Sequence, residues 1–243
     1  MRGVCDGRHY LFENVYRHFL GVGSHPIRMP SFLSGDKSIR IDIHEPATPG
    51  PHPAIVLLHG SGGNASFWTE RIAPHISGRN IALYVLNYFD RTGTTRASYD
   101  DIIDGYHFPA WLSTISDGLA YIRTRPNVDP SRIALVGHSL GAFLGLSLAT
   151  DPATKIRAIV EISGGLADPY AAKATSAFPP TLIFHGGADT YVTVSDAEKL
   201  DAQLTALNVL HETHIFPKQT HFFNAVTQLQ ILMATTKFLG KYL

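Results

Sequence analysis

Residues 133–149 constrain the fold more than any other part of this sequence. They read as an apolar run, then Gly-His-Ser-Leu-Gly, then a second apolar run. The first run is typical of a buried strand, and the apolar spacing after Gly141 is typical of a helix. A strand that turns directly into a helix crowds its backbone, and Gly137 and Gly141 fit there because glycine has no Cβ. Such a turn leaves Ser139 exposed at the end of the strand, which predicts Ser139 as a nucleophile.

The remaining sequence alternates between apolar strand-like runs and segments with helical spacing. Before the first of these runs, residues 27–43 predict an antiparallel hairpin with turn residues at Ser34, Gly35 and Asp36. This order predicts an α/β fold with a mostly parallel, doubly wound sheet and helices on both faces. Strands are expected at 54–58, 81–86, 133–137, 156–162, 181–184 and 209–216, and helices at about 67–77, 109–123, 195–206 and 224–239.

Length and composition limit the other possibilities. A chain of 243 residues fits one domain over 1–243. Its first 25 residues form an N-terminal extension, with a short amphipathic segment at 9–20. Twenty basic and 20 acidic residues give a net charge of zero, so we expect no nucleic-acid partner and no membrane surface. The single Cys5 excludes an internal disulfide, and no run of 18 apolar residues or apolar leader is present. A cytoplasmic location is therefore expected.

Four segments of the sequence carry a resemblance to known proteins. They are Leu-Leu-His-Gly-Ser-Gly-Gly at 57–63, Gly-His-Ser-Leu-Gly at 137–141, His-Gly-Gly-Ala-Asp at 185–189 and Pro-Lys-Gln-Thr-His at 217–221. Over residues 40–243 the chain resembles the α/β-hydrolases, and more narrowly the dienelactone hydrolases. Those enzymes have cysteine where this chain has Ser139, so the resemblance supports the fold and the triad better than it supports that family's substrate. Residues 163–180 are too short for the large cap domain that larger hydrolases place there.

A serine hydroxyl needs a base within hydrogen-bond reach and a carboxylate that orients the base. In the α/β-hydrolases these follow in the order serine, acid, histidine. Ser139, Asp189 and His221 satisfy that order, and Asp189 and His221 each follow a predicted strand, at the edge where such sheets place their sites. Asp189 could instead be a turn residue, and Asp168 is the alternative acid.

The resemblance also implies an oxyanion hole made of two backbone N–H groups. One is expected from Leu140, directly after the nucleophile, and the other from Ser61 or Gly62 in the glycine-rich loop after the strand at 54–58. Side chains near the strand ends are candidates for the substrate pocket, although core packing would explain the aromatic ones equally well. The candidates are His59, Tyr88, Trp111 and Phe222.

Together these features predict a serine hydrolase that cleaves small carboxylic esters or lactones through an acyl-enzyme, with no cofactor. No metal is expected, because His211 and His214 are three residues apart in a strand and so point to opposite faces. Three alternatives stay open. The first two are an oligopeptidase-like peptidase and a non-catalytic binding protein with the same fold. The third is a dinucleotide-binding oxidoreductase, because residues 60–65 fit Gly-x-Gly-x-x-Ala and Asp90 could bind a ribose.

Overall fold

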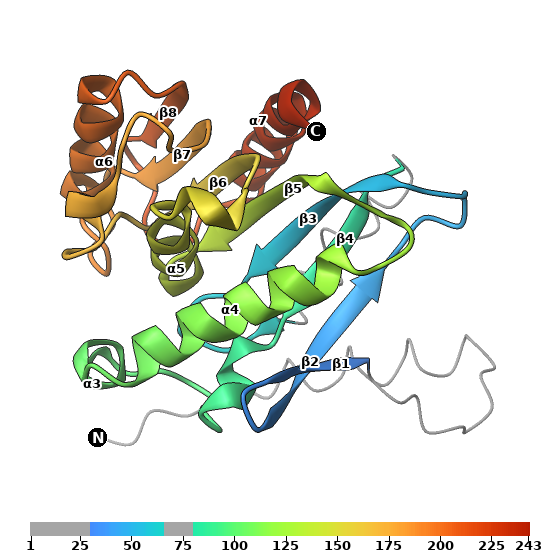
Figure 1. Ribbon diagram of the computed structural model, residues 1–243. Helices are drawn as coiled ribbons and strands as arrows, with labels where there is room; N and C mark the ends of the chain where they lie inside the picture. The colour runs from blue at the N-terminus through green and yellow to red at the C-terminus, as the bar shows by residue number, and fades with distance from the viewer. Residues whose placement is uncertain (1–29, 66–79) are drawn as a thin grey trace, which may run out of the picture.

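The computed structural model describes residues 30–65 and 80–243. The segments predicted at 9–20 and 67–77 lie outside the described residues. Eight strands form one sheet in the order β1-β2-β4-β3-β5-β6-β7-β8 (Figure 1). Their bounds are β1 Ser31–Ser34, β2 Lys37–His44, β3 His52–Leu58, β4 Ala82–Leu86, β5 Val128–His138, β6 Ala158–Ile162, β7 Thr181–Gly186 and β8 His211–Phe216.

The strands from β4 to β8 in this order are parallel to one another. The first two strands form the predicted hairpin, which turns at Gly35 with a φ of +57° and joins the sheet antiparallel to β4. The mostly parallel sheet expected from the sequence is therefore confirmed. Parallel strands need long crossovers, which is why helices separate them in the sequence.

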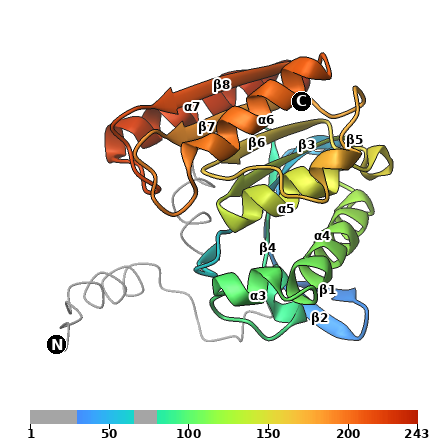
Figure 2. The same cartoon turned by 90° about the vertical axis from the view of Figure 1, so that its left-hand side faces the viewer.

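Helices cover the sheet on both faces. The α-helices are α3 Tyr99–Ile103, α4 His107–Arg123, α5 Leu140–Ala149, α6 Val194–Ala206 and α7 Ala225–Tyr242, and the 3-10 helices are η2 Tyr88–Arg91, η3 Pro152–Thr154 and η4 Ala171–Lys173. Helices α4, α5 and α6 lie on one face and α7 lies on the other (Figure 2).

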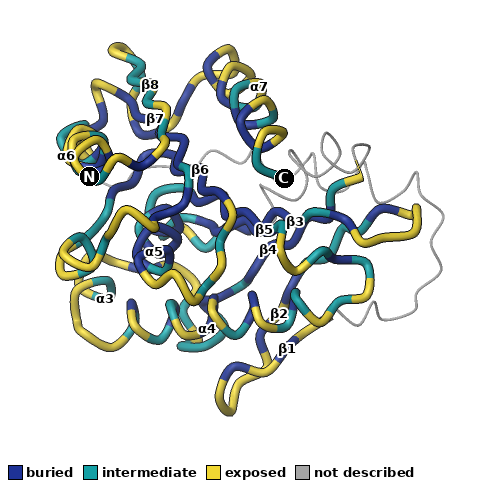
Figure 3. Tube along the Cα trace, turned by 45° about the horizontal axis from the view of Figure 1, so that its top comes forward, coloured by how far each residue is buried: buried dark blue, intermediate teal, exposed yellow. Residues whose placement is uncertain are grey.

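The apolar run of β3 explains this two-layer covering. Ala54, Val56 and Leu58 belong to the core under α4, α5 and α6, whereas Ile55 and Leu57 belong to the core under α7. Successive side chains of a strand point to opposite faces, so a strand covered on both sides is apolar throughout. Figure 3 shows the result, with buried strands at the centre and helices exposed on their outer sides.

Helix α3 was not among the predicted elements, although the sequence contains its start signal. The side chain of Ser98 accepts a hydrogen bond from the backbone of Asp101, and the Asp101 side chain accepts one from the backbone of Ser98. This reciprocal pair satisfies two N–H groups at the helix start. Helix α3 buries none of its own residues, so no apolar periodicity marks it.

Between β6 and β7 the chain forms only loop and the short η4, which agrees with the expected lack of a large cap in the part of the chain that is described. None of the helices within 30–65 and 80–243 combines the length and the apolar character that crossing a bilayer requires.

Candidate active site

Ser139 stands in a strained turn between β5 and α5. Its φ of +53° and ψ of −122° lie outside the regions that a serine usually adopts. A Cβ on Gly137 would lie 2.4 Å from the carbonyl oxygen of Gly141, and a Cβ on Gly141 would lie 2.2 Å from that of Leu58. Both glycines therefore occupy the positions that the sequence predicted for them, and the turn lifts the serine above the end of the sheet.

A chain of hydrogen bonds joins the three predicted triad residues. The Nε2 atom of His221 lies 3.0 Å from Oγ of Ser139, and its Nδ1 lies 2.7 Å from Oδ2 of Asp189. The other carboxylate oxygen of Asp189 accepts hydrogen bonds from the backbone N–H groups of Tyr191, at 2.8 Å, and Val192, at 3.1 Å. Both Asp189 and His221 are buried. This arrangement fixes the carboxylate and holds the imidazole between an acid and a hydroxyl.

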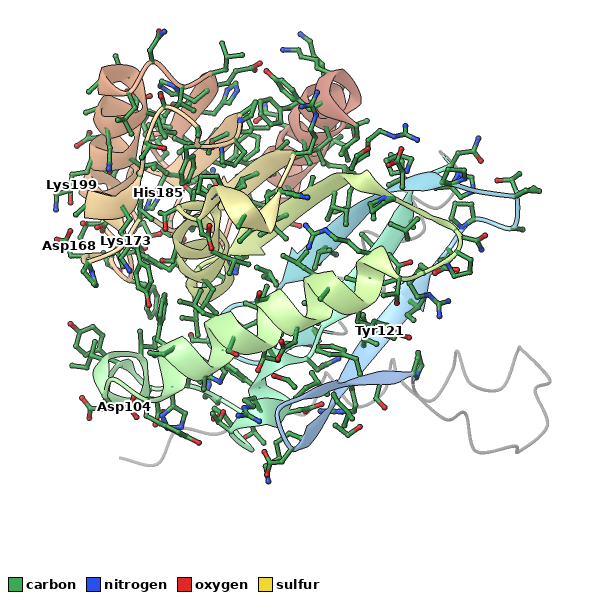
Figure 4. The ribbon with its side chains drawn as sticks, in the orientation of Figure 1. Asp104, Tyr121, Asp168, Lys173, His185 and Lys199 are labelled. Atoms are coloured by element: carbon green, nitrogen blue, oxygen red, sulfur yellow. The ribbon has the colours of Figure 1, made fainter. Side chains whose placement is uncertain are left out.

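The alternative acid does not take part in this chain. Asp168 lies on the loop after β6, shortly before η4, which ends at Lys173 (Figure 4). Asp168 lines the cleft, but Asp189 is the acid hydrogen-bonded to His221. His185, also labelled in Figure 4, is buried at the end of β7 and donates to the carbonyl oxygen of Val192 at 3.0 Å. It supports the loop that carries Asp189.

The glycine-rich loop after β3 lies beside the nucleophile. It turns back on itself through a hydrogen bond of 3.1 Å from Gly63 N to Gly60 O. It is tied to the segment before α3 by a bond of 2.8 Å from Ala97 N to Ser61 O. Ser61, Gly62 and Leu140 all line the cleft that contains Ser139. The residues expected to supply the two backbone N–H groups therefore line the same cleft as Ser139.

The structure places three of the predicted pocket residues in the core rather than on the cleft. His59, Tyr88 and Trp111 are buried and do not line the cleft. The ring of Tyr88 stacks on that of His59 at 4.1 Å, and its hydroxyl donates to the His59 carbonyl oxygen at 2.6 Å. Desolvation by burial lowers the pKa of His59 to about 4. Tyr88, on η2, thus supports His59 at the start of the glycine-rich loop from the core side, and Trp111 on α4 packs against Tyr88 with ring centroids 6.0 Å apart. Phe222, the fourth candidate, lines the cleft.

Several residues of the cleft were missed by sequence reasoning. Helix α3 contributes apolar side chains, and others come from α5, from the loop before β7 and from the loop after Asp189. They are Tyr99, Ile102, Ile103, Phe143, Tyr170 and Tyr191. The Ser-x-x-Asp signal of α3 could have located the first three. The others carry no local pattern, because loops and a uniformly apolar helix bring them together.

Two further titratable side chains lie close to the nucleophile. Glu161 is buried in β6, where its Oε2 accepts a hydrogen bond of 2.7 Å from Gly164 N, and desolvation by burial raises the pKa of its carboxyl to about 8. The ring of His138 lies 5.2 Å from that of His221. Desolvation by burial lowers the pKa of His138 to about 4. His138 is therefore neutral at neutral pH.

The described residues contain no group of three His, Cys, Asp or Glu side chains placed to hold a metal ion. In β8, His214 stacks on Phe184 at 5.3 Å, whereas His211 lies 3.3 Å from Asp201 on α6. Asp90, the ribose ligand of the dinucleotide alternative, binds the Arg40 guanidinium through both of its oxygens, at 2.7 and 2.9 Å. The carboxylate that the oxidoreductase hypothesis requires is already paired.

The sheet order, the strained serine turn and the hydrogen-bonded serine, histidine and aspartate define an α/β-hydrolase. The model of the dienelactone hydrolase family matches residues 39–231, and the chain belongs to that family.

The individual relatives share a third or less of their aligned residues with this chain. Mouse mitochondrial acyl-coenzyme A thioesterase 2 is 32% identical over 168 residues, which are 67% of this chain and 32% of the relative. This chain thus spans about a third of that curated relative's length. Among solved structures, a dienelactone hydrolase-like promiscuous phosphotriesterase from metagenomic libraries is similar with a TM-score of 0.76 and 19% identity, covering 88% of this chain and 97% of its own. Esterase 2 of Thermogutta terrifontis, solved with propionate bound, gives a TM-score of 0.69 and 16% identity, with 88% and 94% covered. At these identities the structures support the fold.

Proposed function

We propose that this chain is a serine carboxylesterase that cleaves small esters or lactones through an acyl-enzyme on Ser139. The observation that carries the proposal is the unbroken hydrogen-bond chain from Asp189 through His221 to Ser139. A serine next to a neutral imidazole can lose its proton as it attacks, and a buried carboxylate holds that imidazole in the required tautomer.

In the first half of the reaction, Nε2 of His221 takes the Ser139 hydroxyl proton while Oγ forms a bond to the carbonyl carbon. The tetrahedral intermediate collapses, the bond to the alcohol oxygen breaks, and His221 passes the proton to that oxygen. The alcohol leaves and an ester with Ser139 remains. Water then repeats the sequence, with His221 as base, and releases the acid and free Ser139.

The intermediate places a negative charge on the former carbonyl oxygen. We assign its stabilisation to the backbone N–H of Leu140 and to that of Ser61 or Gly62. Leu140 is the first residue of α5, so its N–H has no carbonyl acceptor within the helix. A lost oxyanion donor costs about 2.7–4 kcal/mol in other acyl-transfer enzymes.

The relatives support ester chemistry but do not select a substrate. The Thermogutta esterase was solved with propionate and, in another structure, phosphorylated by paraoxon. By analogy, a short acyl group and reaction with an organophosphate are expected of this chain. The alternatives of an oligopeptidase-like peptidase and a non-catalytic binding protein use the same fold but different substrates or no turnover.

Two measurements test the proposal. Purified protein is assayed with nitrophenyl acetate and butyrate, a lactone, a thioester and a short peptide, and is then treated with paraoxon and examined by intact-mass and peptide mass spectrometry. We expect ester or lactone turnover and one diethylphosphoryl adduct on Ser139, both lost in Ser139→Ala. A folded protein with neither turnover nor adduct would contradict the proposal, as would an adduct that persists in Ser139→Ala.

A further inference from the structure

Two large aromatic side chains flank the His221 imidazole and are exposed. Tyr191 is 78% exposed and Phe222 is 68% exposed, and both line the cleft that contains Ser139. The Tyr191 ring centroid lies 5.4 Å from that of His221, and the Phe222 centroid lies 5.1 Å from it. Covering such exposed aromatic surface with an apolar part of a ligand would be favourable, because it removes that surface from water.

The triad fixes the backbone positions from which both rings extend. The backbone N–H of Tyr191 donates to Asp189, and Phe222 directly follows His221 in the chain. The two rings also contact each other edge to face, with centroids 6.1 Å apart and an angle of 68° between their planes. A ligand that binds against them therefore meets a surface that is already formed, which lowers the cost of ordering it.

The chemistry of the reaction decides which part of a substrate meets this surface. His221 must deliver a proton from Nε2 to the alcohol oxygen, so that oxygen comes within hydrogen-bond reach of the imidazole. The carbonyl oxygen is assigned to the N–H groups of Leu140 and of Ser61 or Gly62, rather than to the imidazole. The alcohol part of the ester, rather than its carbonyl oxygen, is thus the part next to Tyr191 and Phe222.

We propose that Tyr191 and Phe222 form a leaving-group subsite that binds an apolar ring on the alcohol side of the ester. This proposal rests on the proposed esterase function and adds the substrate class to it. Aromatic rings in contact prefer offset or edge-to-face arrangements, and the two side chains, themselves edge to face, offer both a face and an edge to a third ring. Neither ring side chain carries a positive charge, so an anionic leaving group gains no ion pair from them.

The test compares benzyl acetate with ethyl acetate. The two share an acyl group and therefore the same acyl-enzyme, and their alcohols have similar acidity, so the difference in kcat/KM reports contacts with the ring. We expect the wild-type ratio of benzyl to ethyl kcat/KM to exceed 10, and Tyr191→Ala and Phe222→Ala each to lower that ratio by about 3- to 10-fold, as one aromatic contact would. Benzyl alcohol should also inhibit competitively, and less strongly in both variants.

Tyr106→Ala is the matched control, because Tyr106 is an exposed aromatic residue that does not line the cleft. It should leave the ratio unchanged. If Tyr191→Ala and Phe222→Ala reduce both esters equally, the rings only position His221 and the subsite proposal fails. Variants that leave kcat/KM of both esters at the wild-type values also overturn it, while the esterase function stands. If the wild type hydrolyses neither these esters nor the nitrophenyl esters, the proposed function itself has failed.

Discussion

The Nε2 atom of His221 lies 3.0 Å from Oγ of Ser139, although 82 residues separate the two in the sequence. The sheet accounts for this proximity. Ser139 follows β5 and His221 follows β8, and both strands are parallel members of one sheet, so their carboxyl ends lie at the same edge. The contact between His221 and Ser139 therefore depends on strand order, and the proposed role of each group around it can be tested separately.

Replacing the acid should abolish most activity without unfolding the protein. Asp189→Asn keeps the shape of the side chain but leaves His221 without the carboxylate that fixes its tautomer, so kcat should fall on the order of 10⁴-fold. Steady-state kinetics with a nitrophenyl ester measure this. Asp168→Asn is the matched control, because Asp168 lines the same cleft and Asp189 is the acid bonded to His221. Equal losses in the two variants would contradict the assignment of the acid.

The elbow glycine should tolerate no side chain. In Gly141→Ala the added Cβ would lie 2.2 Å from the Leu58 carbonyl oxygen and 2.6 Å from that of His59, so the backbone has to move. We expect a loss of at least about 3 kcal/mol in the free energy of unfolding, the upper end for added core methylenes, or no folded protein at all.

A second glycine of α5 provides the comparison for that variant. A Cβ on Gly145 would meet nothing closer than 3.4 Å, which is ordinary contact. Alanine also favours a helix over glycine by about 0.5–1 kcal/mol. Gly145→Ala should therefore be as stable as the wild type or more stable in urea denaturation. A Gly141→Ala protein as stable as Gly145→Ala would show that the close approach at the elbow is wrong.

Glu161 should make the protein less stable as the pH rises. Burial raises the pKa of its carboxyl from an ordinary value near 4.5 to about 8, so between these values the folded state binds the proton and the unfolded state does not. The stabilisation is complete below pH 4.5 and is lost as the pH rises to about 8. Linkage gives a slope on the order of 1 kcal/mol per pH unit within that window.

Glu161→Gln should remove this slope, since glutamine has nearly the same shape and does not titrate. Urea denaturation of the variant and the wild type at several pH values between 5 and 8 measures the difference. Glu198→Gln is the control, because it makes the same substitution at a glutamate that is exposed on α6. Parallel stability profiles for the wild type and Glu161→Gln would contradict a buried, protonated carboxyl.

Tyr88 should contribute to stability rather than to substrate contact. Tyr88→Phe removes the hydroxyl that donates to the buried His59 carbonyl oxygen, and an acceptor left without a partner costs about 1–3 kcal/mol. We expect that loss in the free energy of unfolding and little change in KM across a series of esters. Tyr191→Phe, at an exposed ring, should not change stability. If Tyr88→Phe changed KM by different factors for different esters, Tyr88 would be a substrate contact and this prediction would be wrong.

The sequence alone determined the sheet and the serine turn because their signals are local. A strand covered on both faces has to be apolar throughout, as residues 54–58 are, and the elbow needs glycines at 137 and 141 because no Cβ fits there. The order of Ser139, Asp189 and His221 along parallel strands was likewise enough to place them at one edge. Each of these inferences needs only backbone geometry or residue order.

Only the tertiary structure decided which side chains line the cleft. His59, Tyr88 and Trp111 follow strand ends or lie on a helix near them, as pocket residues do, yet they are buried against one another. Tyr191 and Phe222 are exposed beside the imidazole. The direction of a side chain in a loop depends on contacts between segments far apart in the chain, and no spacing or composition in the sequence encodes those contacts.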